Sequence, residues 1–418
     1  MTLPQMITLE QNFEVRQLAD PAADIKDGLT RLHLAQRVKP GQRVALALSS
    51  RGIANYPLIV KTLVHSLRQY GLDVFIVPAM GSHGAATAAG QKRVLEHLGI
   101  LEKEVGAPII SSLEVDQIAR TAEGLPVYID RQAHAADHIV LVNRIKKHTE
   151  FTHEFESGLM KMMAIGLGKQ KGAAVYHQAM LRFGYARVIT QVARKVLATA
   201  GILFGVGVVE DGYGHTAQIR ICPPDSLEKD EIALFKEARR LAPALPFDAA
   251  DILIIDEMGK DISGTGFDTK VVGRIGLPLL APEPETPVIK RIVVCDLTRA
   301  SEGNAVGVGI ADVITQRLYE KIDRPALDIN TITGVCPEMG KIPLTMKNDR
   351  TAIAVAVKCV GLMPPSDLKI MRIKNTLKLD RVEVSEAYAG HIDDRPALRI
   401  LEKEHAMRFT ASGRLLPL

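Results

Sequence analysis

The feature that most constrains the fold of this chain is an alternation, in its first half, of short apolar runs with longer amphipathic segments. Four apolar runs predict buried strands: 43–50, 72–80, 138–145 and 202–211. Helical patterns follow the first two runs, over residues 55–71 and after Gly84. Because short strands that alternate with helices assemble into parallel sheets, we expect an α/β fold with a largely parallel sheet covered by helices.

The second half of the chain repeats this pattern after a charged helical segment at 226–246 that ends in prolines. Three more apolar runs predict strands, at 250–259, 291–298 and 351–361. We therefore predict two α/β domains, an N-terminal domain over residues 1–247 and a C-terminal domain over residues 248–418. Polar, glycine-rich loops follow the second-domain strands, so we expect the C-terminal domain to close an active-site cleft between the two.

The composition argues against several classes of protein. Of 418 residues, 47% are hydrophobic, and 52 Lys and Arg nearly balance 48 Asp and Glu, which disfavours a disordered chain. A net charge of +4 without a basic run interleaved with aromatic residues gives no support for a nucleic-acid partner. The four scattered cysteines predict reduced thiols, and we find neither a signal-peptide pattern nor an apolar run long enough to cross a membrane. We expect a cytoplasmic protein with no membrane partner.

Polar clusters directly follow three of the predicted strands. They are a Ser-Ser-Arg triplet ending at Arg51, GSHG containing His83, and KKHTEF containing His148. In a parallel sheet these loops converge at one edge, where ligands bind. Arg51 can hold a carboxylate through two parallel hydrogen bonds, and a histidine just before a helix tends to stay neutral and able to accept a proton. The alternative is that the glycines around His83 only form a tight turn and leave its ring solvated.

The segment 152–178 combines helix-start residues with a lysine. Ser157 fits the N-cap of a helix, and Lys161 falls in the first turns of that helix. An amine near a helix N-terminus is less easily protonated and is therefore a better nucleophile at neutral pH. Gly158 allows close approach of an anionic group such as a phosphate to the helix start. Alternatively, this is an ordinary apolar helix whose lysine reaches the surface.

Farther along, GLGKQKG (166–172) interrupts this helix and adds Lys169, and a second helical segment carries His177. Considered alone, His177 is more often a structural histidine than a metal ligand. Taken in order, however, the clusters resemble the lactate racemase-like family: Arg51, His83 in GSHG, His148 in KKHT, Lys161 in ESGLMKM and His177 in VYHQ. The resemblance runs from about residue 10 to about residue 400 and is strongest over residues 144–178.

The resemblance implies a cofactor. Members of the family use a nickel-pincer nucleotide, which is a pyridinium-thioamide-thiocarboxylate mononucleotide that carries nickel. By this resemblance Lys161 is joined to the cofactor as a thioamide, and His177 is a nickel ligand. We expect Ser157, Gly158 and Lys169 to contact the cofactor as well. Enzymes that synthesise the cofactor are the implied protein partners.

The resemblance also implies residues that handle the substrate. His83 and His148 would act as alternate bases, Arg51 would hold the substrate carboxylate, and Lys270 in GFDTK would complete the site from the second domain. The spacing from KKHT to the cofactor lysine is longer than in lactate-specific members, so His153 competes with His148 for the role of second base. We favour His148 because it directly follows a predicted strand end.

The expected substrate is a small 2-hydroxy acid other than lactate. Lactate-specific members close the pocket with a tryptophan, and this chain has none. Second-domain loops instead offer polar groups that suit a polyhydroxylated aldonate such as gluconate: Asp261, Ser263, Thr265 and Asp268. Because the Cα–H of such an acid is not activated, hydride removal and return to the opposite face, with the hydroxyl proton taken by a base, would invert C2. We therefore predict a racemase or epimerase.

Two other interpretations stay open. The fold could serve a binding protein that never acquires the cofactor, although the joint presence of Lys161 and His177 disfavours this. The chain could also be an NAD-dependent dehydrogenase acting on the same acids. The absence of a GxGxxG motif at a strand-to-helix turn disfavours that second interpretation.

Overall fold

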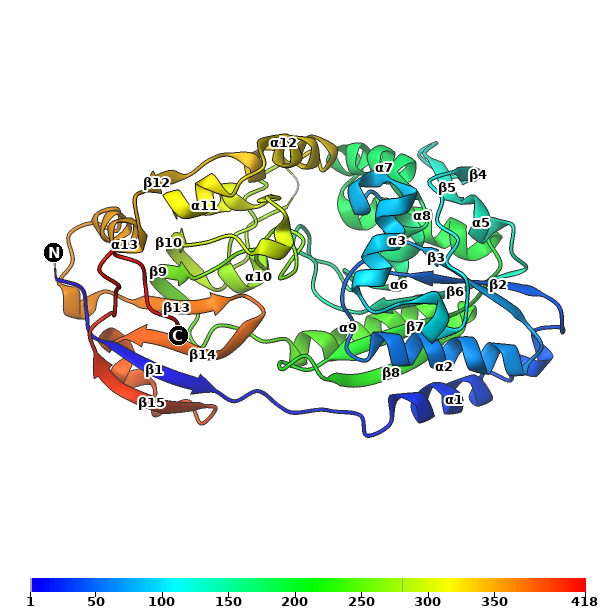
Figure 1. The fold of residues 1–418 in the computed structure, drawn as a ribbon, viewed down its shortest axis with the longest axis horizontal. Helices are drawn as coiled ribbons and strands as arrows, with labels where there is room; N and C mark the ends of the chain where they lie inside the picture. The colour runs from blue at the N-terminus through cyan, green and yellow to red at the C-terminus, as the bar shows by residue number, and fades with distance from the viewer. Residues whose placement is uncertain (1, 280) are drawn as a thin grey trace. The chain divides into compact units, whose positions relative to one another are not determined.

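The computed structural model describes residues 2–279 and 281–418, which form two compact units (Figure 1). One unit spans Val15–Ala242, and the other combines the N-terminal residues up to Glu14 with Pro243–Leu418. The unit border thus lies close to residue 247, where the composition of the chain changes. The first 14 residues differ from the expected 1–247 domain, because strand β1 (Met6–Gln11) pairs with strands near the C-terminus.

The Val15–Ala242 unit is built on a five-stranded sheet with the strand order β3-β2-β6-β7-β8. Its strands are β2 (Arg43–Leu48), β3 (Asp73–Pro78), β6 (His138–Arg144), β7 (Ile202–Glu210) and β8 (Thr216–Cys222). The first four run parallel and β8 is antiparallel to β7. All four strands that the apolar runs predict in this half of the chain are therefore confirmed.

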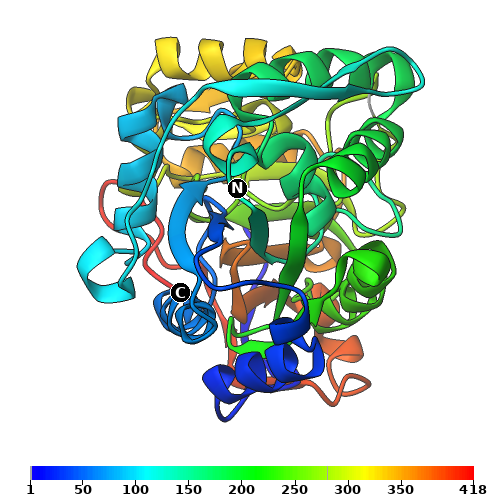
Figure 2. The same cartoon turned by 90° about the vertical axis from the view of Figure 1, so that its right-hand side faces the viewer.

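Helices cover both faces of this sheet, as Figure 2 shows with the unit turned toward the viewer. The main helices are α1 (Pro21–Arg31), α2 (Tyr56–Gln69), α3 (Ala88–His97), α7 (Lys169–Phe183), α8 (Tyr185–Thr199) and α9 (Leu227–Leu241). The short ones are α4 (Glu102–Val105), α5 (Arg131–His134) and α6 (Leu159–Lys161), and the strands β4 (Val115–Arg120) and β5 (Pro126–Asp130) form a separate hairpin.

The alternation of side chains along β7 explains how two of these helices reach the sheet. Phe204, Val206 and Val208 face one core, together with apolar residues of α1 and α2. On the opposite face, a Cβ at Gly205 would lie 2.6 Å from the Leu159 side chain, and one at Gly207 would lie 2.5 Å from that of Leu234. These glycines therefore allow α6 and α9 to pack directly against the strand.

The other unit has an eight-stranded mixed sheet with the order β12-β11-β10-β9-β13-β14-β1-β15. Its further strands are β9 (Ala249–Ile255), β10 (Val288–Val294), β11 (Val313–Thr315), β12 (Leu344–Met346), β13 (Ile370–Asn375), β14 (Lys378–Ser385) and β15 (Leu398–His405). Along this order, neighbouring strands from β12 through β11, β10 and β9 to β13 pair in parallel. The pairings of β13 with β14, β14 with β1 and β1 with β15 are antiparallel. The helices are α10 (Thr269–Val272), α11 (Gln316–Glu320), α12 (Arg324–Thr333) and α13 (Asp349–Lys358). Both units are α/β with mostly parallel sheets, which confirms the predicted fold class.

The strand predicted at 351–361 is wrong, because this segment forms most of helix α13. Asn348 and Thr351 form a capping box at its start. The buried positions Ala352, Ile353 and Ala356 recur at helical spacing, which a short apolar run conceals. The strands β13 to β15 were not predicted, and β15 shows why: its residues are mostly exposed and carry no alternating apolar pattern.

Two further expectations concern the chemistry of the whole chain. Across residues 2–279 and 281–418, no helix combines the length and the apolar character needed to cross a membrane. All four cysteines are free thiols, three of them buried and Cys359 exposed. The cytoplasmic location stays a prediction.

Candidate active site

The loops after β2 and β3 meet at the carboxyl edge of the parallel sheet, as the sequence predicts. Leu48 at the end of β2 pairs with Pro78 of β3 on one side and with Val142 of β6 on the other. Beyond these strand ends, the Ser50 hydroxyl lies 2.5 Å from Nδ1 of His83. This contact fixes the orientation of an otherwise exposed imidazole at the edge of the sheet.

The backbone that follows Lys161 packs against the His83 loop. Helix α6 continues into a π-helical turn over Met162–Gly166, a conformation that is frequent at functional sites. The Gly81 N–H donates to the Gly166 carbonyl at 3.2 Å, and a Cβ at Gly166 would lie 2.7 Å from the Ala79 carbonyl oxygen. The turn therefore brings the helix of Lys161 close to the loop that carries His83.

Lys161 combines a lowered pKa with a histidine neighbour. Burial lowers the pKa of its amine from 10.5 to about 8; Glu150 opposes this change and the Arg51 guanidinium adds to it. The Nζ atom contacts Nε2 of His148. A substantial fraction of the amine is thus neutral near pH 8, and a neutral amine is the nucleophilic form.

His148 is held in one orientation. Its side chain lies among aromatic rings, with its centroid 4.7 Å from that of Phe151 and 5.9 Å from that of Tyr185, and the residue is only 8% exposed. The Glu150 backbone N–H donates to Nδ1 at 3.0 Å. Since Nδ1 accepts this bond, the proton of the neutral ring resides on Nε2, the atom that faces Lys161.

The geometry favours His148 over His153 as the histidine near the lysine. His153 is half-buried and packs edge-on against Phe155, with 4.8 Å between the ring centroids. His177 lies half-buried on α7, the first helix after the π turn. Within the described residues, no group of three His, Cys, Asp or Glu side chains could hold a metal ion.

Arg51 is a half-buried cation for which the described residues offer no anionic partner. No hydrogen bond or ion pair joins its guanidinium to another residue in the described parts of the chain. Burial lowers the pKa of Arg51, and Arg144 adds to this effect. Arg144 itself is paired with Glu210. The Arg51 side chain therefore suits an anion that the protein does not itself supply, and a carboxylate matches its paired donors.

The predicted N-cap role of Ser157 is wrong. Helix α6 begins after Gly158, and Ser157 instead pairs with Lys146 through two backbone hydrogen bonds of 2.9 and 3.1 Å. The N–H groups at the helix start are satisfied by a protein carboxylate, since the Met160 N–H donates to Oε2 of Glu231 on α9 at 2.7 Å. The space that Gly158 leaves is filled by this carboxylate and not by an external anion.

The structure gives Lys169 a supporting position and no access to a ligand. Its side chain is fully buried, and three oxygen atoms surround its Nζ: Asp130 Oδ2 at 3.1 Å, Gln91 Oε1 at 2.8 Å and Pro78 O at 2.5 Å. The Gln91 amide in turn donates to the carbonyls of Gly81 at 2.8 Å and His83 at 3.3 Å. Lys169 thus stabilises the loop of His83 from beneath, and direct contact with a cofactor would disrupt this network.

The second-unit residues predicted near the substrate are only partly available. Ser263 and Thr265 are 3% and 2% exposed, and the Thr265 hydroxyl donates to the Phe267 carbonyl at 2.8 Å. Asp268 caps the short helix α10 by accepting the backbone N–H of Lys270 at 2.9 Å. The two buried hydroxyls therefore cannot contribute to a polar substrate surface, because burial removes them from any ligand.

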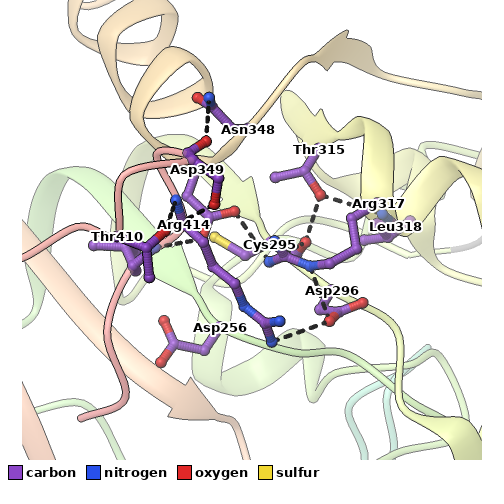
Figure 3. A network of polar contacts seen from close by, with 12 residues as sticks. Asp256, Cys295, Asp296, Thr315, Arg317, Leu318, Asn348, Asp349, Thr410 and Arg414 are labelled. Atoms are coloured by element: carbon purple, nitrogen blue, oxygen red, sulfur yellow. Dashed lines mark hydrogen bonds and ion pairs between the residues drawn. The ribbon is translucent and has the colours of Figure 1, made fainter.

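A different polar network occupies the carboxyl edge of the parallel strands in this second unit (Figure 3). Arg317 donates to Asp296 at 2.9 Å and to Asp349 at 3.0 Å, and Arg414 lies 3.7 Å from Asp296. The other oxygen of Asp349 accepts the backbone N–H of Leu415 at 2.7 Å. These carboxylates are matched by cations and N–H groups of the chain itself, so this network anchors the C-terminal segment.

Several supporting residues, among them Glu231, are not predicted by the sequence patterns above. The buried positions of α9 are Leu227, Glu231, Leu234, Phe235, Ala238 and Leu241. Glu231 therefore falls on the apolar face of a helix whose other acidic residues point outward. A carboxylate at an apolar helical position was the signal that could have identified it.

Comparison with known proteins connects this geometry to one family. Residues 5–187 match the family model described as the lactate racemase N-terminal domain. A structural-genomics target from Thermotoga maritima is similar in structure, with 14% identity and a TM-score of 0.55 over 88% of this chain and 99% of that one. The lactate racemase apoprotein from Thermoanaerobacterium thermosaccharolyticum shows 13% identity and a TM-score of 0.51 over 90% and 99%. At these identities the two structures show a shared fold. A search of curated proteins finds no match.

Proposed function

Since residues 5–187 match the family model of the lactate racemase N-terminal domain, we propose that this protein is a racemase or epimerase that inverts C2 of a 2-hydroxy acid. The observation that carries the proposal is the grouping of Lys161, with its lowered amine pKa, against His148 and near an Arg51 that has no anionic partner. A carboxylate clamp, a nucleophilic amine and imidazoles at one sheet edge match the needs of a 2-hydroxy acid and a covalently attached cofactor.

The residues present fit the nickel-pincer nucleotide that the family uses. Lys161 would hold it, because a neutral amine is needed to form a thioamide and burial lowers the pKa of this amine to about 8. By the family resemblance, His177 on α7 would be a nickel ligand. When bound, the nucleotide supplies an acceptor for the hydride of C2.

The chain's own residues would position the substrate and move its hydroxyl proton. Arg51 would bind the carboxylate through two hydrogen bonds and so fix C2. His83, oriented by Ser50, would exchange the hydroxyl proton for one enantiomer. His148 would do so for the other enantiomer. Two bases are needed because the hydroxyl of each enantiomer occupies a different pose.

The substrate we propose is a polar acid such as gluconate and not lactate. The absence of tryptophan supports this choice. Of the polar second-unit loop, Asp261 is exposed and accepts a hydrogen bond of 2.5 Å from Thr298, and Asp268 is half-buried. Because Ser263 and Thr265 are buried, the polar side chains of this loop that we propose for substrate contact are Asp261 and Asp268.

The first test is the intact mass of the protein after co-expression with cofactor-synthesis enzymes and nickel. We expect a mass increase in the wild type and in the control Lys171→Ala, which removes an exposed lysine of the same segment, but none in Lys161→Ala. The loaded wild type should then interconvert the C2 epimers of gluconate faster than the enantiomers of lactate, measured by chiral chromatography. An unchanged mass in all three proteins, with no bound nucleotide by native mass spectrometry, would count against the proposal.

A further inference from the structure

Helix α9 places a buried carboxylate directly against the start of α6. Glu231 is fully buried, and in the part of the chain that the structure describes no cation forms an ion pair with it. Its Oε2 accepts the Met160 N–H at 2.7 Å, and the Leu159 N–H also bonds to the carboxyl group. The two N–H groups that open the helix of Lys161 are thus satisfied by a residue about 70 positions farther along the chain.

The residue before this helix is compatible with only a small side chain. A Cβ at Gly158 would lie 2.2 Å from Oε1 and 2.8 Å from Cδ of Glu231. The φ of Gly158 is −179°, an extended backbone that any residue can adopt, so glycine is required here for space and not for conformation. Asn143 holds the same residue from the other side, because its amide donates to the Gly158 carbonyl at 2.8 Å.

Below about pH 8 the Glu231 carboxyl group is mainly neutral while it accepts the hydrogen bonds of the helix start. Burial raises the pKa of Glu231 from 4.5 to about 8; the N–H groups of Met160 and Leu159 oppose this, and Glu228 adds to it. Burial raises the pKa of the nearby Cys222 thiol to about 12, and the charges of Asp230 and Glu231 add to this effect. A neutral carboxyl group still offers an oxygen that accepts an N–H, so a glutamine should preserve the contact and an alanine should not.

We propose that Glu231 is a positioning residue for Lys161: it closes the start of α6 and thereby keeps the lysine amine in its buried place beside His148. This inference rests on the proposed role of Lys161 as the attachment residue. Lys161 is one residue beyond Met160, so loosening of this first turn would move the amine toward water. Its charged form would then be solvated again, and the amine would become less nucleophilic at neutral pH.

The experiment measures the pH dependence of Lys161 acetylation in the cofactor-free, full-length protein, by peptide mass spectrometry with exposed Lys171 as internal reference. Glu150, Arg51 and His148 face the Lys161 amine and are unchanged in every variant. We expect Glu231→Gln to keep the wild-type midpoint near pH 8. We expect Glu231→Ala to raise the midpoint by one pH unit or more, which slows acetylation at pH 7 about tenfold. Equal midpoints in wild type and Glu231→Ala, or equal shifts in both variants, would overturn the proposal.

A second variant tests whether a shift in Glu231→Ala comes from the lost contact and not from misfolding. Gly158→Ala should displace the Glu231 carboxyl group and raise the Lys161 midpoint in the same direction. In the Glu231→Ala background, Gly158→Ala should add little further shift, because the carboxyl atoms it displaces are gone and only the terminal Cδ1 of the Ile145 side chain, 2.7 Å from the new Cβ, must move. Additive shifts would contradict the inference. These measurements need no cofactor, so they can fail while the mass test of the proposed function succeeds, and the reverse.

Discussion

The parallel strands of the two main sheets end in polar edges of opposite character. At the edge in the Val15–Ala242 unit, Arg51 has no anionic partner among residues 2–279 and 281–418, and burial lowers the pKa of Lys161 to about 8. At the corresponding edge in the other unit, the carboxylates of Asp296 and Asp349 are matched by Arg317 (Figure 3). The difference teaches that position at a carboxyl edge does not alone identify a site. The first edge is distinguished by the positive charge of Arg51, which no carboxylate of the described residues pairs with.

The largest effect should come from breaking the buried network of the second edge. Arg372 is 3% exposed and binds both oxygens of Asp256, at 2.8 and 2.9 Å, and Glu383 at 3.0 Å. Arg372→Met leaves Asp256 without its cation and Glu383 with only His405 at 3.9 Å, and should lower the free energy of unfolding by about 3–5 kcal/mol, measured with denaturant. The acetylation profile of Lys161 should not change. A shift in that profile would break the contrast between the two edges.

Substitution at the first edge should affect activity and leave stability nearly unchanged. Arg51→Met should lower kcat/KM of the loaded enzyme for its 2-hydroxy acid by about 100-fold, because the substrate carboxylate loses its clamp. Its free energy of unfolding should stay the same or rise, since repulsion from Arg144 is removed. Arg43→Met, at the opposite end of the same strand, is the matched control. A large loss of stability in Arg51→Met would assign this arginine to the fold.

The smallest of these effects concerns pH and stability. Because the pKa of Glu231 is raised to about 8 in the folded protein, the native state binds more protons than the unfolded state between about pH 4.5 and pH 8. This contribution to stability is present at low pH and is lost as the pH rises through 8. Glu231→Gln should therefore reduce the decline in the free energy of unfolding between pH 6 and pH 9 by about 1 kcal/mol or more. Parallel declines in both proteins would show that the carboxyl group titrates normally.

The residues proposed to bind or react were more accessible to sequence reasoning than the residues that hold them in place. Arg51, His83 and His148 follow apolar runs, so the expectation of a parallel sheet places them at one edge. The wrong N-cap prediction for Ser157 and the unforeseen burial of Lys169 have a common cause. The sequence around a serine before a helix, or around a lysine after glycines, is the same whether the residue contacts a ligand or another part of the protein. The contacts that decide this come from residues far along the chain: Glu231 at the helix start and Asp130 at the lysine.

By itself, the sequence determined the α/β class, the four strands of the first sheet and the loops that carry its polar side chains. Periodicity decides these features, because burial on a sheet or helix repeats over a few residues. The tertiary structure alone decided that residues before Glu14 pair with β14 and β15, that 351–361 is a helix and that Glu231 caps α6. Such contacts join residues tens to hundreds of positions apart. They depend on which buried polar group finds a partner, and no local pattern encodes that choice.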